Sequence, residues 1–331
     1  MMLFGYRSPA TWFLAASLTY ALGCSDGPPL PPFSAAALPA DSLRAHEIVF
    51  VSDTQAPLWV ETLALQEDQN REATARIFQD IGARKPLAVF ILGDVVNLGF
   101  DEGEWQIMGG LIDGLRSEGI PVNALLGNHD VMFFATEGER QFQRHFPSHR
   151  RTGYVKIVDS LAVVLLNSNV ITMDDVALDS QQRWYEQTMT DLSRDPGIAA
   201  IVVTCHHSPF TNSILVGSSL QSQERFVTRF LAEPKARLFM SGHAHAFEHF
   251  RKEGKDFLVI GGGGGLQHPR YTGSEQRHAD LSPTHAKPRF HYAFIRRLGE
   301  HLEVTVRRLE QDKSRTADYY ALGIPLREER K

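Results

Sequence analysis

Strand-length apolar runs alternate with helical patterns between residues 47 and 130, and this order strongly restricts the possible fold. The runs and the helix-period segments between them are EIVFVSD (47–53), 68–83, LAVFILGD (87–94), 103–119 and PVNALLGNHD (121–130). A β-α-β-α-β order predicts a layered α/β domain with parallel strands. Ligands bind beyond the carboxyl ends of such strands. We therefore expect Asp53, Asp94 and Asn128, which follow the three runs, to lie close together.

The second half of the chain shows the same alternation with more antiparallel character. It contains a hairpin pattern (154–168), a helix (180–195), a strand with its loop (198–209), a helix (220–234), a short strand (237–242) and three later strands (255–265, 290–298 and 301–309). His243 and His245 follow the short strand, two residues apart. In an extended segment this spacing points both imidazoles to one face, as metal ligands require.

The charge balance argues against nucleic acid as a partner. The 331 residues carry a net charge of -5 at neutral pH, with 43% apolar and 22% charged residues. This composition allows a large core in one domain or two. Because the chain has no basic surplus to neutralise phosphates, we expect no nucleic-acid surface.

The N-terminal 45 residues have a different character from the remainder of the chain. The apolar stretch 10–23 is too short to span a bilayer but has the length of a signal-peptide core. It runs into Cys24, and ALGC-S resembles the lipobox of bacterial lipoproteins. The resemblance implies a signal peptide over 1–23, an acylated Cys24 anchored in a membrane, and a proline-rich tether over 24–45. The protein would then be a periplasmic or outer-membrane lipoprotein. An ordinary secretory peptide is the alternative.

The chain holds two cysteines, Cys24 and Cys205. Cys205 lies within an apolar run, where a thiol usually acts as a small core residue. If Cys24 carries lipid, it cannot form a disulfide bond. A bridge between the two cysteines is the alternative for an exported chain.

Five short motifs follow apolar runs in a fixed order along the chain. They are SDTQ (52–55), LGDVVN (92–97), GNHD (127–130), CHHSP (205–209) and GHAH (242–245). Their order and spacing resemble the calcineurin-like metallophosphoesterases, a group that includes the purple acid phosphatases. The resemblance implies an α/β fold, a four-layer αββα sandwich of two mixed β-sheets flanked by helices. The resemblance covers residues 46 to about 265 well, and we expect the metallophosphoesterase domain to span 46–310. The charged segments near the C-terminus favour a solvated C-terminal tail at 311–331.

The resemblance also implies two divalent metal ions, manganese, iron or zinc, and a set of ligands for them. Asp94 would bridge the ions. The first ion would add Asp53 and His245, and the second would add Asn128, His207 and His243. Two such ions hold a hydroxide that attacks phosphorus. The implied activity is hydrolysis of phosphate mono- or diesters.

Two further residues have implied roles near the leaving group. His129 is the expected acid or electrostatic group at the leaving oxygen, and Asp130 would fix the tautomer of His129. In CHHSP the family ligand is the histidine that stands two residues before proline, which is His207. His206 is then expected to point into the core.

Two positions depart from the family pattern. Gln55 stands where the first motif usually ends in histidine, and an amide oxygen at the first metal site favours harder ions such as manganese or magnesium. Asn97 stands where the purple enzymes carry a tyrosine, so we expect no coloured phenolate complex.

An alternative function is that of a metal-binding lipoprotein that has lost turnover through Gln55 and acts as a recognition module. The substrate and the oligomeric state stay open.

Overall fold

The computed structural model describes residues 46–57, 70–283 and 287–327. The predicted signal peptide, the lipid anchor at Cys24 and the tether up to residue 45 lie outside these residues. Within them, no helix has the length and the apolar character needed to cross a membrane.

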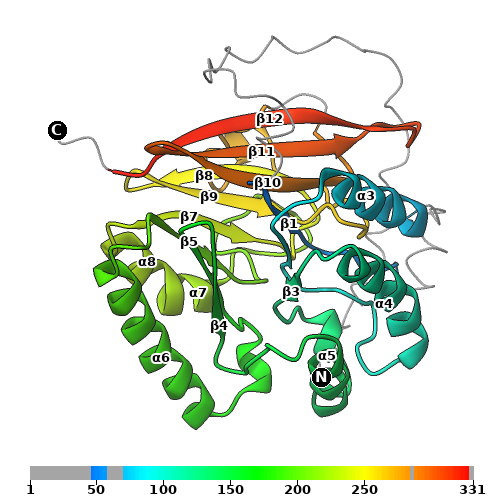
Figure 1. Ribbon diagram of the computed structural model, residues 1–331, viewed down its shortest axis with the longest axis horizontal. Coiled ribbons are helices and arrows are strands. Elements are labelled where there is room, and N and C mark those ends of the chain that lie inside the picture. The colour runs from blue at the N-terminus through cyan, green and yellow to red at the C-terminus, as the bar shows by residue number, and fades with distance from the viewer. Residues whose placement is uncertain (1–45, 58–69, 284–286, 328–331) are drawn as a thin grey trace, which may run out of the picture.

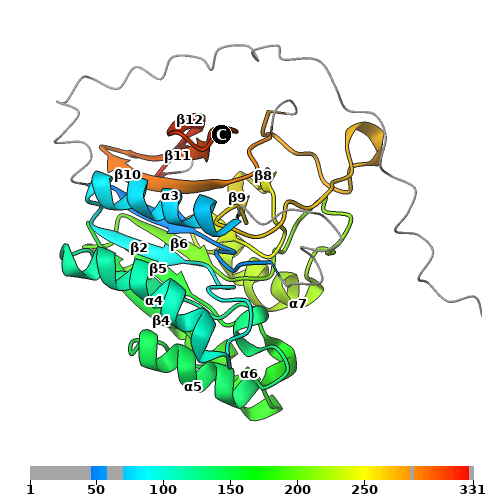
Figure 2. The same ribbon diagram turned by 90° about the vertical axis from the view of Figure 1, so that its right-hand side faces the viewer.

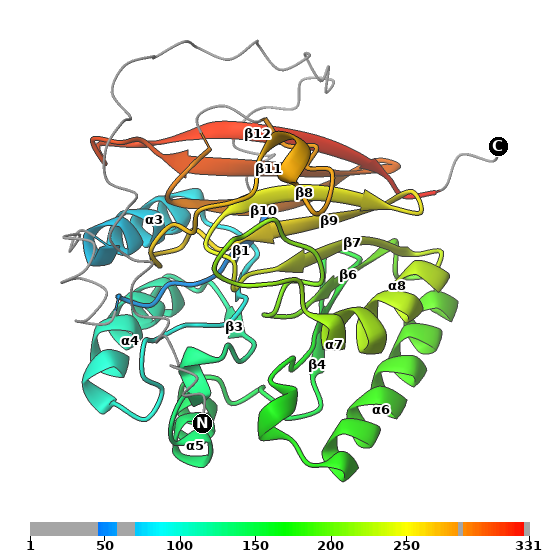
Figure 3. The same cartoon turned by 180° about the vertical axis from the view of Figure 1, so that it is seen from behind.

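The first sheet has six strands in the order β12-β11-β10-β1-β2-β3 (Figures 1 and 3). The strands are β1 (Ile48–Val51), β2 (Ala88–Ile91), β3 (Val122–Ala124), β10 (His291–Leu298), β11 (His301–Leu309) and β12 (Thr316–Pro325). β1, β2 and β3 pair in parallel, as the β-α-β-α-β pattern predicted. β10, β11 and β12 pair antiparallel, so the sheet is mixed.

The second sheet also has six strands, in the order β4-β5-β6-β7-β9-β8. They are β4 (Tyr154–Val158), β5 (Leu161–Leu165), β6 (Ala200–Thr204), β7 (Ala236–Ser241), β8 (Phe247–Lys252) and β9 (Lys255–Ile260). β4 and β5 form the predicted hairpin. β5, β6, β7 and β9 pair in parallel, while β8 returns antiparallel to β9.

Helices cover the outer face of each sheet. The helices on the first sheet are α3 (Asn70–Arg84), α4 (Glu102–Ser117) and α5 (Ala135–His145); those on the second are α6 (Asp175–Arg194), α7 (Leu220–Ser222), a π-helical turn (Gln223–Val227) and α8 (Thr228–Ala232). Figure 1 shows these two groups on opposite sides of the molecule, and Figure 2 shows α3 and α4 from their own side. Short 3-10 turns are η2 (His129–Val131), η3 (Val170–Thr172) and η5 (Gly273–Glu275).

The period-two alternation of each strand divides the core into three apolar layers. Alternate residues such as Phe50 and Val202 pack between the two sheets. Their neighbours in sequence face the helices, as Val49 does towards α3 and Val203 towards α6. Side chains on successive strand positions point to opposite faces, and central strands such as β1, β2, β5 and β6 are buried on both faces. The predicted four-layer αββα sandwich is confirmed.

The first sheet extends past residue 310, which corrects the predicted boundary of the C-terminal tail. β12 pairs with β11 along its full length, from Leu309 opposite Thr316 to His301 opposite Pro325. Tyr320 and Ile324 of β12 are buried in the layer between the sheets. The folded domain therefore continues to at least residue 325. The prediction failed because polar and apolar residues alternate weakly in this edge strand.

Asp80 of α3 ties the helix to strands β10, β11 and β12. Its carboxylate accepts hydrogen bonds from Tyr292 and from Thr316 Oγ1, and it pairs with Arg307 at 3.2 Å. Burial opposes ionisation of this carboxyl. The hydrogen bonds from Thr316 and Tyr292 and the charge of Arg307 outweigh it and hold the pKa of Asp80 below its ordinary value of 3.8.

We expect Asp80→Asn to lower the Tm at pH 7 and to lose this effect in acid. A carboxyl with a depressed pKa stabilises the fold above its unfolded-state pKa, and this stabilisation disappears as the pH falls through the folded-state pKa. The difference in Tm should therefore shrink as the pH falls from about 4 downward. Thermal unfolding between pH 7 and pH 2.5 measures it. Asp113→Asn, at a side chain that is 73% exposed on α4, is the control and should leave the Tm unchanged. A pH-independent difference for Asp80→Asn would contradict the assignment.

Candidate metal centre

Polar side chains from both sheets meet at the carboxyl ends of the parallel strands. Asp53 and Asp94 follow β1 and β2 of the first sheet, and Asn128 follows β3. His206 follows β6 and His243 follows β7 of the second sheet. Because the sheets stack face to face, side chains that lie far apart in the sequence occupy one buried volume.

Two groups of ligand atoms share Asp94. In the first group, Asp53, Asp94 and His245 place one atom each within 4.8 Å of the others. In the second group, Asp94, His206 and His243 do the same. Asp53 and Asp94 are almost fully buried, at 0% and 1% exposed. Two buried carboxylates among imidazoles form a donor set suited to divalent transition-metal ions.

His206 faces the second group directly. Its Nε2 lies 3.2 Å from Asp94 Oδ2 and 3.1 Å from Asn128 Oδ1. Its Nδ1 lies 2.9 Å from the carbonyl oxygen of Leu92, which requires a proton on that nitrogen in the neutral ring. The carbonyl therefore keeps the Nε2 lone pair directed at the centre, as in many histidine ligands.

His207 lies outside both groups, which differs from the expectation drawn from the family motif. Its Nδ1 lies 2.9 Å from Ser168 Oγ, and its ring packs against that of His243 at 4.5 Å between centroids. His206, which was expected to point into the core, occupies the position beside Asp94 instead. The family motif and the ligand groups thus select different histidines of CHHSP, and the binding of metal by variants of each distinguishes them.

Gln55 lies at the first group. Its amide nitrogen is 3.4 Å from Asp94 Oδ2 and 3.3 Å from His245 Nε2, and its Oε1 is buried without a hydrogen-bond partner among the described residues. Rotation of the amide group by half a turn would point Oε1 at these two side chains. A buried carbonyl oxygen next to a carboxylate and an imidazole is a fitting cation ligand.

The backbone is strained at three residues of the centre. Asp53, Asp94 and His243 have φ values of 58°, 50° and 65°, in the left-handed region that residues with a Cβ rarely adopt. Each such residue costs about 1–3 kcal/mol, and these conformations cluster at functional sites. The left-handed turns bring all three side chains back over the strand ends.

A glycine makes the close approach of the two motif loops possible. A Cβ on Gly127 would lie 2.1 Å from the backbone nitrogen and from Oδ1 of Asp94. Only glycine therefore lets the loop before Asn128 pass against Asp94. The same packing allows the amide of His129 to donate to Asp94 Oδ1 at 2.8 Å.

The centre concentrates opposing charges in a dry environment. Burial favours the neutral ring of His206, but the charge of Asp94 outweighs it and raises the pKa of His206 to about 9. Burial and the neighbouring His206 lower the pKa of His207 to about 3. Burial opposes ionisation of Asp94, but the charges of His206 and His129 hold its pKa below the ordinary range. A divalent cation bound here would replace the proton on His206.

Asn97 holds His129 at the rim of the centre. His129 Nδ1 lies 3.0 Å from the backbone oxygen of Asn97 and 3.1 Å from its side-chain oxygen. A backbone carbonyl only accepts hydrogen bonds, so His129 carries its proton on Nδ1 in the neutral ring. The Nε2 atom is then the position that exchanges a proton with a bound molecule.

Asp130 has a different contact from the predicted one. Its Oδ1 accepts hydrogen bonds from the amides of Val95 and Val96 at 3.0 and 3.2 Å, and its Oδ2 accepts one from Gly127 at 2.8 Å. Asp130 therefore fastens together the loops that carry Asp94 and Asn128. Asn97, and not Asp130, orients His129. Burial and the charge of Asp94 raise the pKa of Asp130 to about 8.

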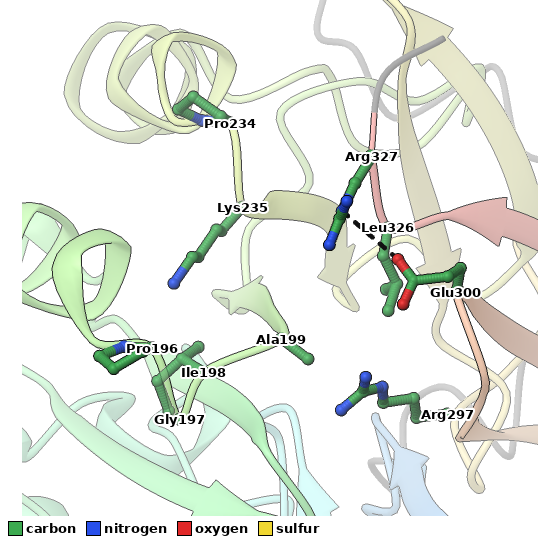
Figure 4. A pocket seen from close by; sticks show the side chains of 10 residues that line it. All are labelled: Pro196, Gly197, Ile198, Ala199, Pro234, Lys235, Arg297, Glu300, Leu326 and Arg327. Atoms are coloured by element: carbon green, nitrogen blue, oxygen red, sulfur yellow. Dashed lines mark ion pairs between the residues drawn. The ribbon is translucent and has the colours of Figure 1, made fainter.

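A separate cavity of about 430 Å³ lies at the opposite edge of the sheets (Figure 4). It is lined by residues that precede β6 and β7, such as Ile198 and Lys235, and by residues at the ends of β10 and β12, such as Arg297 and Leu326. The strand ends that carry Asp53, Asp94 and His206 point away from it. This cavity is therefore not part of the candidate metal centre.

One protein-family model matches the part of the chain that contains both ligand groups. Residues 46–247 match the family model described as calcineurin-like phosphoesterase. The chain belongs to the calcineurin-like phosphoesterase family. This match contains all the residues of both ligand groups and confirms the resemblance seen in the motifs. The comparison with curated proteins gave no match.

Solved structures of other proteins share the fold at low sequence identity. Purple acid phosphatase from yellow lupin has a TM-score of 0.62 at 14% identity, over 84% of this chain and 53% of the lupin chain. GAP50, the anchor in the inner membrane complex of Plasmodium, has a TM-score of 0.63 at 10% identity, over 86% and 90%. A dimetal phosphatase from Danio rerio has a TM-score of 0.51 at 10% identity, over 83% and 98%. These likenesses show the fold alone, and this chain spans about half of the lupin protein.

The two adjacent histidines of this family member give a direct test of the geometry. We expect His206→Ala to weaken the binding of one divalent ion by at least about tenfold, because His206 Nε2 faces Asp94 and Asn128. His207→Ala is the matched neighbour and should retain two ions per chain. Elemental analysis and titration of the metal-free protein measure both variants. Loss of metal in His207→Ala with full retention in His206→Ala would contradict the structure and support the motif-based expectation.

Proposed function

We propose that this protein is a binuclear metal-dependent phosphoesterase that hydrolyses phosphate mono- or diesters. Asp94 carries the proposal, because this one buried carboxylate belongs to both ligand groups. A carboxylate shared between two cation sites can hold two ions close enough to stabilise the attacking and leaving oxygens of an in-line displacement at phosphorus. The proposed ligands are Asp53, Gln55, Asp94 and His245 for one ion, and Asp94, Asn128, His206 and His243 for the other.

The protein groups have separate tasks in this reaction. When bound, two divalent cations, manganese, iron or zinc, supply positive charge that polarises the phosphoryl group and lowers the pKa of water. Asp94 and Asp53 balance that charge inside a buried volume. The left-handed turns at Asp53 and Asp94 and the close loop at Gly127 keep these side chains in place before any substrate arrives. This preorganisation reduces the reorganisation needed in the transition state.

His129 is the proposed proton donor to the leaving oxygen. Its amide is fixed to Asp94 Oδ1, and its Nδ1 is fixed to Asn97, so Nε2 is available at the rim of the centre. A protonated ring can transfer the Nε2 proton to the departing alkoxide while Asn97 retains the Nδ1 proton. A pure recognition module would need neither this histidine nor its support. We therefore favour the enzyme over a metal-binding protein without turnover.

The protein is further proposed to be exported and anchored by lipid at Cys24, as the lipobox-like sequence indicates. The environment of Cys205 favours acylation of Cys24 over a disulfide bond between Cys24 and Cys205. Among the described residues, Cys205 is a buried free thiol, and burial raises its pKa to about 12. A buried thiol with a raised pKa forms a disulfide with difficulty.

We expect His129→Ala to keep both metal ions and to slow esters with poor leaving groups more than activated aryl esters. Its imidazole contributes about 10²–10⁴-fold to reactions in which the leaving oxygen needs a proton. Asn97→Ala should produce a smaller loss of the same kind, with a shifted pH profile, because it positions His129. Steady-state kinetics with an alkyl and a nitroaryl phosphate, together with metal content, measure both. Equal slowing of the two esters would overturn the acid role. No hydrolysis of any phosphate ester by the metal-loaded wild type would overturn the proposed function.

A further inference from the structure

Exposed apolar side chains stand on three loops that leave the carboxyl ends of the strands beside the metal centre. Phe133 is 76% exposed, Ile171 is 91% exposed and Leu215 is 58% exposed. Phe134 and Ile214, beside two of them, are 60% and 46% exposed. We call these five residues the apolar rim. Single exposed apolar residues are ordinary, but several around one functional site indicate a contact surface.

Each loop of the apolar rim follows, or is hydrogen-bonded to, a residue in or beside the centre. Phe133 comes four residues after His129, just past the η2 turn. Ile171 lies in η3, three residues after Ser168, whose hydroxyl contacts His207 at 2.9 Å. Leu215 and Ile214 follow Ser213, whose hydroxyl lies 3.3 Å from His268.

His268 connects the third loop to a metal ligand. Its ring stacks on His245 at 4.2 Å between centroids. The amide of Ile214 also donates to the carbonyl of Pro269 at 2.9 Å. The loop that carries Ile214 and Leu215 is thus held against the first ligand group.

Phe133 is unusual in backbone conformation as well as in exposure. Its φ is 62°, which is a marked outlier for an aromatic residue. Its neighbour Phe134 packs edge-on against Phe100, with 4.9 Å between ring centroids. Phe133 itself is 76% exposed. Strain that exposes an aromatic ring beside a reaction centre is a sign of a binding role.

We propose that the apolar rim docks onto a lipid surface and that the substrate is a phosphoester in a lipid headgroup. This inference rests on the proposed function. An apolar rim around a phosphoester-cleaving centre is complementary to a molecule whose phosphate lies next to hydrocarbon. In a bilayer this arrangement is found at the interface, where amphipathic surfaces with Phe, Leu and Ile insert.

The length of the N-terminal segment is compatible with this docking. The 22 residues from Cys24 to residue 45 can reach at most about 75 Å when fully extended. β1 begins at Ile48 and runs towards the centre, so the described part of the chain begins at the opposite edge of the domain. A chain anchored at Cys24 has enough reach for the domain to turn the apolar rim towards the same membrane.

The reaction at the surface is a balanced hydrolysis. Water forms a new oxygen–phosphorus bond, and the bond between phosphorus and the lipid oxygen breaks. His129 gives its Nε2 proton to the departing lipid oxygen, and a proton from the attacking water restores the histidine. A lipid alcohol and inorganic phosphate result from a monoester.

The test uses the full chain carrying Cys24→Ser, so that no acyl group contributes to binding. Vesicles of phosphatidylcholine with phosphatidic acid serve as both surface and substrate, and a soluble nitroaryl phosphate serves as the reference. The variants are Phe133→Ser with Phe134→Ser, Ile171→Ser and Leu215→Ser. Ile157→Ser on β4 is the matched control, since Ile157 is 58% exposed and pairs with Ala162 near the opposite end of β5.

We expect the protein to co-sediment with the vesicles and to release phosphate from phosphatidic acid. Removing two phenyl rings from the apolar rim should weaken vesicle partitioning by at least about tenfold, because each ring would otherwise bury apolar surface in the bilayer. Ile157→Ser should partition as the parent does. The ratio of lipid to aryl phosphate turnover should fall with the rim variants.

Three outcomes would overturn parts of the account separately. Aryl phosphate turnover without vesicle binding, or binding that the rim variants do not change, would overturn the docking surface alone. Vesicle binding through the rim with aryl phosphate turnover but no phosphate release from phosphatidic acid would overturn the lipid phosphomonoester as substrate. Rim-dependent binding with no turnover of either ester would support the surface and overturn the proposed function.

Discussion

The buried carboxylate of Asp94 is the group on which the rest of the centre depends. It contacts His206 from the second sheet, accepts the amide of His129 from the β3 loop and lies beside Gln55 from the β1 loop. An isolated ionised carboxylate in such a volume would be strongly unfavourable, so it needs charge partners. Imidazoles and, in the proposed function, cations provide them. The same demand for positive charge makes this edge of the sandwich the candidate metal centre.

Stacking of the two sheets determines which side chains can serve Asp94. The apolar layer between the sheets contains Phe50, Phe90 and Val202, and it brings the strand ends of both sheets together. Asp130 then fastens the β2 and β3 loops by accepting three backbone amides. The centre is therefore rigid on the side of the first sheet. Its outer side is formed by loops that bear the apolar rim.

The order of layers and the positions of Asp53, Asp94, His243 and His245 could be predicted, because strand-length runs and short motifs determine them locally. The position of His206 beside Asp94 could also have been predicted from the alternation along β6. Ala200 and Val202 face the other sheet, whereas Ile201, Val203 and Cys205 face the helices. Continuing this alternation places His206 on the side of Asp94, whereas the spacing to proline selects His207 as the ligand.

Other features had no local signal. The contact of Asp130 with the amides of Val95, Val96 and Gly127 depends on how two loops pack, and no pattern within GNHD encodes it. The support of His129 by Asn97 arises in the same way. β12 was missed because its pairing with β11 supplies most of its order, and an edge strand needs only weak alternation. Long-range pairing, rather than propensity, determined these parts of the structure.

Metal stoichiometry of Asp94→Asn tests the central claim most directly. The substitution keeps the shape of the side chain and removes the charge that both ligand groups share. Titration of metal-free wild type with manganese or zinc should saturate at two ions per chain, and Asp94→Asn should bind neither ion tightly, with circular dichroism unchanged. Two tightly bound ions in a folded Asp94→Asn protein would show that Asp94 is not the shared ligand, and the two-metal account would be wrong.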